Sequence, residues 1–242
     1  MKQRLDHLLV IHKLVDTRSQ AENWLRLGRV KVDGRIITKP GTFVSADATI
    51  TLDAPERYVS RAGLKLASVA GRFKVSFTDS VVLDVGSSTG GFTDYALQHG
   101  ARKVFAVDVG TDQLHPSLRG NDRIELHEKT DIRNFTPSEV PTIVVMDVSF
   151  ISSRQILPHV ASIVDGATDL LIMVKPQFEA QRHQITNGGI VKNDGVRRTI
   201  LKEFELWTKQ FFVIIDKADS EVKGAHGNLE RFYHLRKIKS LR

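Results

Sequence analysis

The sequence predicts an α/β fold with a seven-stranded, mostly parallel sheet covered by helices, preceded by a small α+β module. Three observations predict it. Strand-like and helix-like segments alternate beyond residue 60, a glycine-rich turn follows the first of these strands, and the character of the sequence changes near residue 55. The 242 residues suffice for two domains. We expect an N-terminal module over residues 1–55, a linker over 56–62 and the sheet domain over 63–242.

Composition narrows the possible functions. The 35 Lys and Arg residues outnumber the 28 Asp and Glu residues, and a net charge of +7 favours an anionic partner, either nucleic acid or an acidic membrane surface. The absence of cysteine excludes a disulfide scaffold, a thiolate metal site and a cysteine nucleophile. No apolar run approaches the roughly 18 residues of a membrane span, and no secretion signal opens the chain, so we expect a cytoplasmic protein. The histidines form no pair at i, i+4, so we expect no metal site.

The N-terminal module is predicted to hold one short helix and one hairpin. Ser19 and Glu22 have the spacing of a capping box, and Gly28 is placed to end the helix. An alternating stretch then surrounds Asp33–Gly34. This dipeptide best supplies the two positive φ angles of a two-residue hairpin turn.

Basic side chains cluster on this module. Clustered positive charge suits a phosphate backbone, although the solvated side of any small domain would look similar. The candidate phosphate contacts are Arg4, Arg18, Arg26, Arg29 and Lys31. Segments Arg4–Asp6, Arg18–Ala21 and Gly28–Gly34 resemble the RNA-binding module named after ribosomal small-subunit protein four. The resemblance covers residues 1 to about 53 and implies docking onto structured RNA.

The remainder of the chain alternates helices and strands. A helix is expected from Ser60 to about Ala70. The predicted strands are Val81–Val85, Lys103–Asp108, Ile124–His127, Thr142–Asp147, Asp169–Val174, Phe211–Asp216 and Leu229–Leu235. A loop too short for a crossover helix joins the last two strands, so we expect them to pair antiparallel.

A turn rich in small residues follows the first strand and precedes a predicted helix, Phe92–Gln98. Small residues let a ligand approach the backbone closely, although an ordinary tight turn would use them too. Asp108 ends the second strand 22 residues after Gly86, the spacing at which a carboxylate accepts hydrogen bonds from ribose hydroxyls. A nucleoside-containing cofactor is therefore expected. The candidate cofactor-binding residues are Asp84, Gly86, Ser87, Ser88, Thr89, Gly90, Gly91, Phe92, Asp108 and Asp131.

The form of this turn distinguishes between two cofactors. Ser88 stands where a dinucleotide fingerprint has its middle glycine, which disfavours NAD. The segment Asp84–Gly91 resembles the first motif of Rossmann-like methyltransferases, especially the FtsJ-like RNA ribose methyltransferases. That resemblance implies S-adenosylmethionine, with its amino-acid end at the turn. It also implies that Asp131, after the third strand, contacts the adenine.

Charged residues are expected at the edge outside the carboxyl ends of the strands, where α/β sheets bind ligands. Asp147 and Lys175 end two neighbouring strands there, although either charge alone could simply mark where the chain meets water. If the last strand is antiparallel, Glu230 at its beginning lies at the same edge. The first turns of the helix that carries Lys65 lie near it as well. The four residues can therefore converge.

Lys-Asp-Lys-Glu in this chain order resembles the tetrad of RNA ribose 2′-O-methyltransferases. With the N-terminal module, the match narrows to the TlyA, or hemolysin A, family over essentially the whole chain. The matching segments are Arg61–Lys65, Asp147–Ser152, Lys175–Glu179, Gly188–Val191 and Gly227–Glu230. The family implies a Rossmann-like methyltransferase that acts on ribosomal RNA or assembled ribosomal subunits. Its reaction is 2′-O-methylation of cytidine in large-subunit RNA and, in some members, small-subunit RNA.

These residue types suit that reaction. A ribose hydroxyl is a poor nucleophile, so removal of its proton must be assisted. A free lysine has a pKa near 10.4, and a neighbouring cation together with partial burial favours the neutral amine that can accept a proton. We hypothesise that Lys175 takes the proton and Lys65 is the second cation. Asp147 and Glu230 would orient the two lysines.

Three other functions stay open at this point. A non-catalytic RNA-binding or ribosome-assembly protein would need only the N-terminal module. The name hemolysin suggests a membrane-active protein, but the sequence has no span, no secretion signal and no long amphipathic arm. A nicotinamide-dependent reductase is disfavoured by Ser88.

Overall fold

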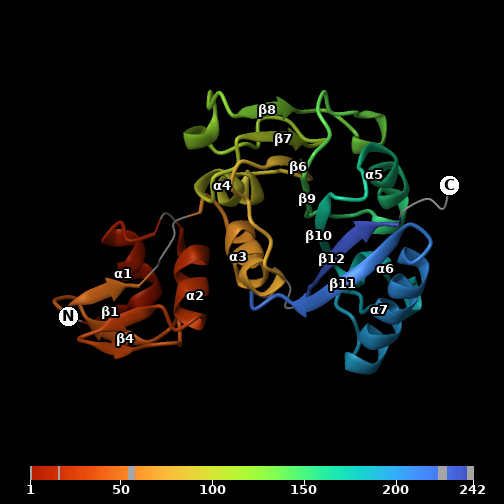
Figure 1. Ribbon diagram of the computed structural model, residues 1–242. Coiled ribbons are helices and arrows are strands. Elements are labelled where there is room, and N and C mark those ends of the chain that lie inside the picture. The colour runs from red at the N-terminus through yellow and green to blue at the C-terminus, as the bar shows by residue number, and fades with distance from the viewer. Residues whose placement is uncertain (1, 16, 54–57, 223–227, 239–242) are drawn as a thin grey trace. The chain divides into compact units, whose positions relative to one another are not determined.

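A computed structural model describes residues 2–15, 17–53, 58–222 and 228–238 (Figure 1). The chain divides into two compact units, Met1–Arg61 and Ala62–Arg242. The linker expected over 56–62 begins in residues outside the described ranges. It ends within the first turn of helix α3 (Arg61–Phe73).

The N-terminal unit contains two short helices and two small antiparallel sheets. The helices are α1 (Leu5–Ile11) and α2 (Arg18–Arg26). One sheet pairs β1 (Lys2–Arg4) with β4 (Phe43–Ser45), and the other has the order β3-β2-β5, formed by Arg35–Ile36, Val30–Val32 and Ile50–Leu52. The sequence analysis predicted α2 and the β2–β3 hairpin but missed α1 and the strands β1, β4 and β5. The missed strands have only three residues each, too short for a clear alternating pattern.

Helix α2 begins two residues earlier than the predicted capping box implies, with Thr17 rather than Ser19 as its N-cap. Thr17 has an extended backbone, and its side chain accepts a hydrogen bond from the Gln20 backbone N–H at 3.2 Å. The Gln20 side chain in turn accepts from the Thr17 N–H at 3.3 Å. The box expected at Ser19 and Glu22 is therefore wrong, because Ser19 already lies inside the helix.

The predicted hairpin turn is confirmed. Strands β2 and β3 flank Asp33 and Gly34, whose φ angles are 49° and 79°. Two consecutive positive φ angles are what a two-residue turn of this type requires. Gly28, with a φ of 68°, follows the last residues of α2 as predicted.

The second unit holds a seven-stranded sheet in the order β11-β12-β10-β9-β6-β7-β8. In that order the strands are Phe212–Asp219, Arg231–Lys237, Asp169–Val174, Ile143–Met146, Val81–Val85, Lys103–Val107 and Ile124–His127. The five strands from β10 to β8 are parallel, whereas β12 is antiparallel to both β10 and β11. The predicted mostly parallel sheet and the antiparallel last pair are thus confirmed.

Helices cover both faces of this sheet. Phe204 of α7 (Asp194–Thr208) packs on Tyr233 of β12, with ring centroids 5.2 Å apart. Phe92 of α4 (Gly91–Gln98) packs at 6.0 Å on Phe232, the preceding residue of the same strand. Successive strand residues point to opposite faces, so α7 and α4 lie on opposite sides of the sheet. Helix α5 (Leu157–Ile163) shares the core of the α7 side.

Two connections of the sheet differ from the expected alternation. The segments after β7 and β8 contain only the three-residue 3-10 helices η1 (Pro116–Leu118) and η2 (Ile132–Asn134). Gly110, Pro116 and Gly120 interrupt the first segment, and these residues disfavour a longer helix. Strand β12 begins at Arg231 rather than Leu229, which leaves Glu230 immediately before the strand.

Candidate active site

Two lysine–carboxylate ion pairs form at the carboxyl edge of the parallel strands. Lys175 Nζ lies 2.6 Å from Asp147 Oδ1, and Lys65 Nζ lies 2.5 Å from Glu230 Oε2. All four side chains are largely buried, from 3% exposed for Glu230 to 16% for Asp147. A buried charge without a partner is costly, so each acid and its lysine hold one another in place.

The sheet topology brings these four residues, here called the tetrad, together. Asp147 and Lys175 directly follow β9 and β10, which are parallel neighbours. The antiparallel register of β10 and β12, continued by one residue, sets Lys175 opposite Glu230. Lys65 reaches Glu230 from α3. The convergence expected from the sequence is therefore present as two adjoining ion pairs.

Lys175 has a second polar contact that the sequence analysis missed. Its Nζ donates a hydrogen bond to Ser149 Oγ at 2.6 Å. Ser149 lies two residues beyond Asp147, in the segment between β9 and η3 (Ser153–Gln155). The sequence signal for this contact is a serine two residues after the acid that ends β9. The contact itself cannot be predicted until the fold places Lys175 beside that serine.

A second buried acid joins the segments after β9 and β10. Ser152 Oγ donates to Glu179 Oε2 at 2.6 Å, and the Ser153 backbone N–H donates to Glu179 Oε1 at 2.7 Å. The Glu179 side chain, at the end of α6 (Pro176–Glu179), is only 1% exposed. These bonds tie the segment that carries Asp147 to the segment that follows Lys175, so Glu179 supports the geometry of the tetrad.

The turn between β6 and α4 has the backbone that its small residues predict. Gly86, Ser88 and Gly90 have φ angles of 80°, 46° and 88°. A Cβ on Gly86 would lie 2.8 Å from the carbonyl oxygen of Asp147, so glycine is needed for the turn to lie against the end of β9. Ser88 adopts the left-handed conformation, and its backbone N–H donates to Asp108 Oδ2 at 2.8 Å.

Asp84 is a buried acid beside this turn. Its Oδ2 accepts a hydrogen bond from Thr93 Oγ1 at 2.7 Å, whereas Oδ1 has no hydrogen-bond partner among the described residues. Burial raises the pKa of Asp84 to about 7, and the negative charges of Asp147 and Asp108 add to the shift. A buried acceptor oxygen without a donor fits a ligand that brings a cation or an N–H group.

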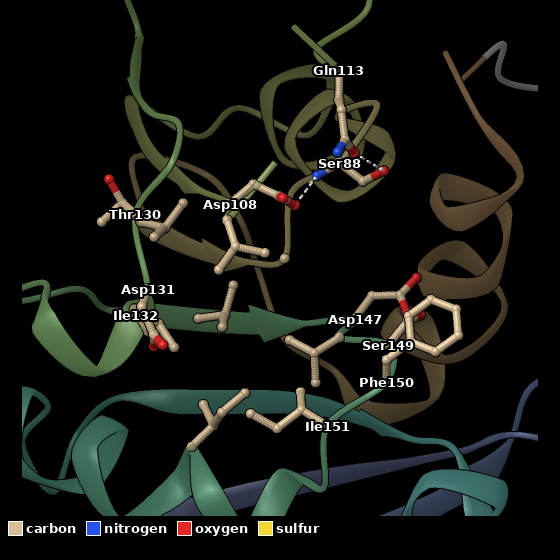
Figure 2. A pocket seen from close by; sticks show the side chains of 16 residues that line it. Ser88, Asp108, Gln113, Thr130, Asp131, Ile132, Asp147, Ser149, Phe150 and Ile151 are labelled. Carbon is tan, nitrogen blue, oxygen red and sulfur yellow. Dashed lines mark hydrogen bonds between the residues drawn. The ribbon is translucent and has the colours of Figure 1, made fainter. Parts of the chain in front are cut away.

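Two cavities lie beside the turn. The larger, of about 360 Å³, extends from Asp147 and Ser149 at one end to Asp131 and Ile132 at the other (Figure 2). The smaller, of about 140 Å³, is lined by Asp84 and Lys175 among others. Both cavities are lined by Gly86, Ser88, Asp147 and Ser149. The larger cavity falls in the range of about 300–1,000 Å³ typical of small-molecule sites.

Most of the predicted cofactor residues line these cavities. The larger cavity is lined by Gly86, Ser88, Asp108 and Asp131, and the smaller by Asp84, Gly86, Ser87, Ser88, Thr89 and Phe92. Gly90 and Gly91 instead form the start of α4. The Asp131 carboxylate also accepts hydrogen bonds from Arg133, which lower its pKa to about 2. Gln113 and Ile151, which line the larger cavity, were not predicted.

The larger cavity suits a nucleoside. Asp108 Oδ1 and Oδ2 accept from the backbone N–H groups of Gly110 and Ser88, which fix the carboxylate at the cavity wall. Ile132 and Ile151 add apolar surface against which a base can pack. The acid and the apolar walls thus offer separate surfaces for a ribose and for a base.

The basic residues of the N-terminal unit fall into two groups. Arg4 and Arg18 both pair with the fully buried Asp6, at 2.8 and 2.9 Å, and therefore hold α1, α2 and β1 together. Arg26 and Arg29 are exposed. Lys31 is half-buried on β2, between the buried Val30 and Val32. Arg26, Arg29 and Lys31 thus keep exposed or half-buried side chains, whereas Arg4 and Arg18 have a structural partner.

Membrane-spanning helices and metal-binding clusters are both absent from the described parts of the chain. Within those ranges, no helix is long and apolar enough to cross a membrane. The described residues also contain no group of three or more His, Asp or Glu side chains that could hold a metal ion.

Comparison with known proteins identifies the family. The model of the FtsJ-like methyltransferase family matches residues 58–237, which include β6 to β12 and the tetrad. The chain belongs to the FtsJ-like methyltransferase family. The S4 domain model matches residues 3–50, which confirms the resemblance of the N-terminal module.

Individual relatives match nearly the whole chain, including both the S4 and the FtsJ-like parts. The 16S/23S rRNA (cytidine-2′-O)-methyltransferase TlyA of Mycobacterium tuberculosis is 35% identical over 97% of this chain and 90% of its own length. Hemolysin A of Brachyspira hyodysenteriae is 35% identical over 96% of this chain and 98% of its own. A solved structure from Streptococcus thermophilus, described as a candidate hemolysin, has a TM-score of 0.74 and 39% identity, and the match covers 99% and 90% of the two chains. The recognition of the TlyA, or hemolysin A, family from sequence is confirmed.

A more distant structure shows the fold alone. The S-adenosylmethionine dependent methyltransferase of Mesorhizobium loti is 11% identical, with a TM-score of 0.55 over 74% of this chain and all of its own. This likeness confirms the Rossmann-like methyltransferase architecture predicted for the second unit.

Proposed function

We propose that this protein transfers a methyl group from S-adenosylmethionine to the ribose 2′-hydroxyl of a cytidine in ribosomal RNA. The observation that carries the proposal is the tetrad, two buried lysine–acid pairs beside the nucleoside-sized cavity. Relatives named for 16S/23S and for 23S rRNA support large-subunit RNA as a substrate. Whether small-subunit RNA is a second substrate is one outcome of the experiment below. Ribosomal RNA as substrate implies a cytoplasmic location.

The residues of the turn and the cavity fit S-adenosylmethionine. We assign its α-amino group to the unpartnered Oδ1 of Asp84, its ribose to Asp108 and its adenine to the apolar wall near Asp131. When bound, the cofactor supplies an electrophilic methyl group on a sulfonium. Lys175 and Asp147 line the smaller cavity with Asp84, so the proposed base lies on the same side of the turn as the assigned amino-acid end.

Lys175 is the proposed proton acceptor. The proton of the ribose 2′-hydroxyl moves to Lys175 Nζ, and the oxygen forms a bond to the methyl carbon. The carbon–sulfur bond breaks with its electron pair left on sulfur. Asp147 holds Lys175, while Lys65, held by Glu230, is the second cation near the reacting oxygen. Alignment of oxygen, methyl carbon and sulfur lowers the barrier, because a well-oriented intramolecular arrangement avoids the entropy cost of encounter.

The N-terminal unit is the proposed RNA dock. Arg26, Arg29 and Lys31 are the basic side chains we expect to contact phosphates. Arg4 and Arg18 retain part of their surface beyond Asp6, being 43% and 56% exposed, so they can reach RNA while they hold the unit together.

The reaction is tested with a labelled methyl group. The purified protein is incubated with S-adenosylmethionine labelled on the methyl carbon and with unmodified large or small ribosomal subunits, and the label is mapped by nuclease digestion. Label on a ribose 2′-oxygen of one cytidine supports the proposal and identifies the subunit. RNA binding without label on either subunit would instead favour a non-catalytic ribosome-assembly protein. Leakage from anionic liposomes caused by the protein alone would favour the membrane-active reading of the hemolysin name.

A further inference from the structure

We infer that Ser149 is a positioning residue for Lys175, because its hydroxyl sets the direction in which the Lys175 amine presents its lone pair to the ribose hydroxyl. The inference rests on the proposed role of Lys175 as proton acceptor. It assigns a function to a side chain outside the tetrad.

The two contacts of Lys175 Nζ differ in kind. The hydrogen bond to Ser149 Oγ is 2.6 Å long and aligned. The ion pair with Asp147 is equally close, at 2.6 Å, but Asp147 Oδ1 has no aligned hydrogen-bond donor among the described residues. The attraction to Asp147 therefore holds the position of Nζ without fixing its rotation. Ser149 provides the directional contact.

Direction matters because of how a neutral amine is built. A neutral lysine has two N–H bonds and one lone pair, arranged tetrahedrally around Nζ together with the bond to Cε. Ser149 takes one N–H bond, and the negative charge of Asp147 attracts the other N–H and repels the lone pair. The remaining direction is left for the lone pair, which must face the proton that it accepts.

The location of Ser149 supports this role. Ser149 lines both cavities, as Asp147 does, and its side chain is exposed. Figure 2 shows Asp147 and Ser149 together at the same end of the larger cavity. Lys65 lacks a comparable arrangement, since no hydroxyl contacts its Nζ within the described residues. Of the two tetrad lysines, Ser149 thus contacts Lys175, the proposed proton acceptor.

The backbone that follows Ser149 is anchored to a neighbouring segment. The following residue, Phe150, has a φ of 65°, which is a strained conformation for a bulky side chain. Beyond it, Ser152 and Ser153 are bonded to Glu179. A serine presented from an anchored, strained segment can set the geometry of a neighbouring group, whereas one on a loose loop could not.

The test compares single-turnover methyl transfer at saturating RNA and cofactor in Ser149→Ala, Ser149→Thr and a matched control, Ser162→Ala, whose exposed hydroxyl bonds within α5. We expect Ser149→Ala to slow transfer by up to roughly a hundredfold, since misplacement of a reacting group by about 1 Å costs that much. The Kd values for S-adenosylmethionine and RNA should stay at the wild-type values. Ser149→Thr, which keeps a hydroxyl, should restore most of the rate, and Ser162→Ala should match the wild type.

A double mutant separates this inference from the proposed function. If Ser149 acts through Lys175, adding Ser149→Ala to Lys175→Ala causes no further loss. A wild-type rate for Ser149→Ala, or an equal loss in both backgrounds, would overturn the inference and leave the proposed function standing. A folded Lys175→Ala protein with the wild-type rate would overturn the assignment of the base itself, and the positioning role with it.

Discussion

Replacement of Asp84 by asparagine should stabilise the second unit at neutral and alkaline pH while it weakens cofactor binding. Asp84 is fully buried, one of its oxygens has no donor within the described structure, and its pKa is raised to about 7. An acid whose pKa is raised on folding makes the folded state less stable as pH increases from its unfolded pKa to its folded pKa. The asparagine side chain has a similar shape and carries no charge at any pH, so the variant lacks this penalty.

The expected change in the free energy of unfolding follows from the pKa shift of Asp84. The pKa rises from 3.8 to about 7, and each unit corresponds to about 1.36 kcal/mol. The full penalty above pH 7 is therefore about 4 kcal/mol, and about 3 kcal/mol of it develops between pH 5 and pH 8. A buried amide N–H without an acceptor costs about 1–3 kcal/mol at every pH. The diagnostic quantity is therefore the free energy of unfolding of Asp84→Asn minus that of the parent, and how much this difference changes from pH 5 to pH 8.

Urea unfolding at pH 5 and pH 8 measures this quantity in the absence of cofactor. The two tryptophans lie in different units, Trp24 in the first and Trp207 on α7. A Trp24→Phe background therefore lets fluorescence follow the second unit alone. Asp108→Asn is the matched control, because Asp108 accepts two backbone N–H groups and its loss should destabilise the unit.

We expect Asp84→Asn to become more stable relative to the parent as pH rises. We also expect added S-adenosylmethionine to raise the urea midpoint of unfolding of the parent far more than that of the variant. A stability difference that is the same at pH 5 and pH 8 would refute the assignment of a raised pKa. Equal protection of both proteins by the cofactor would refute the placement of its amino group at Asp84.

Three further substitutions test other parts of the structure. Asp6→Asn should lower the free energy of unfolding of the N-terminal unit by about 2 kcal/mol at pH 7. This loss should disappear as pH falls through the Asp6 pKa of about 2, which unfolding followed by Trp24 fluorescence would measure. Gly90→Ala should cost about 1–3 kcal/mol and weaken cofactor binding in calorimetry, because φ is 88° and the new Cβ would lie 2.6 and 2.7 Å from Leu118 and Leu114. Phe150→Ala should raise the KM for RNA roughly tenfold with cofactor affinity unchanged, because Phe150, whose ring centroid lies 5.3 Å from that of Phe178, is 92% exposed at the cavity rim and can stack on a base, and such stacking is worth about 1–3 kcal/mol. Wild-type behaviour of any of the three would contradict the corresponding reason.

The central sheet could be predicted from sequence because its strands are buried on both faces. The strand β9 and the part of β10 after Asp169 form continuous apolar runs, and Asp84 alone interrupts the apolar run of β6, so these segments leave little ambiguity. The antiparallel last pair followed from loop length alone. With the sheet order in place, the strand ends that carry Asp147, Lys175 and Glu230 had to meet at one edge.

Local signals failed where two patterns competed. Thr17 with Gln20 and Ser19 with Glu22 both fit the sequence pattern of a capping box, and the extended backbone of Thr17 makes Thr17 the N-cap. The short strands of the N-terminal unit carry too few residues for alternation to be read. The glycines and proline after β7 could have warned against a full crossover helix.

Residues that act through distant partners could not be found from sequence. Ser149 and Glu179 acquire meaning only once β9 and β10 are side by side, because their partners lie 26 and 27 residues away in the chain. Arg4 and Arg18 were counted as free charge, whereas both surround Asp6, a buried acid that composition cannot reveal. A sequence gives the number of charged residues, but the structure is needed to show which of them form ion pairs.

The tetrad is the part of the structure to which we assign ribose 2′-O-methylation. The most direct measurement digests ribosomal RNA to nucleosides after reaction with wild-type protein, Lys175→Ala or the control Lys209→Ala, and identifies methylated nucleosides by mass spectrometry. We expect 2′-O-methylcytidine with the wild type and with Lys209→Ala, and none with Lys175→Ala, which still binds cofactor. A methyl group on a base, or the same yield of 2′-O-methylcytidine from Lys175→Ala, would contradict this assignment.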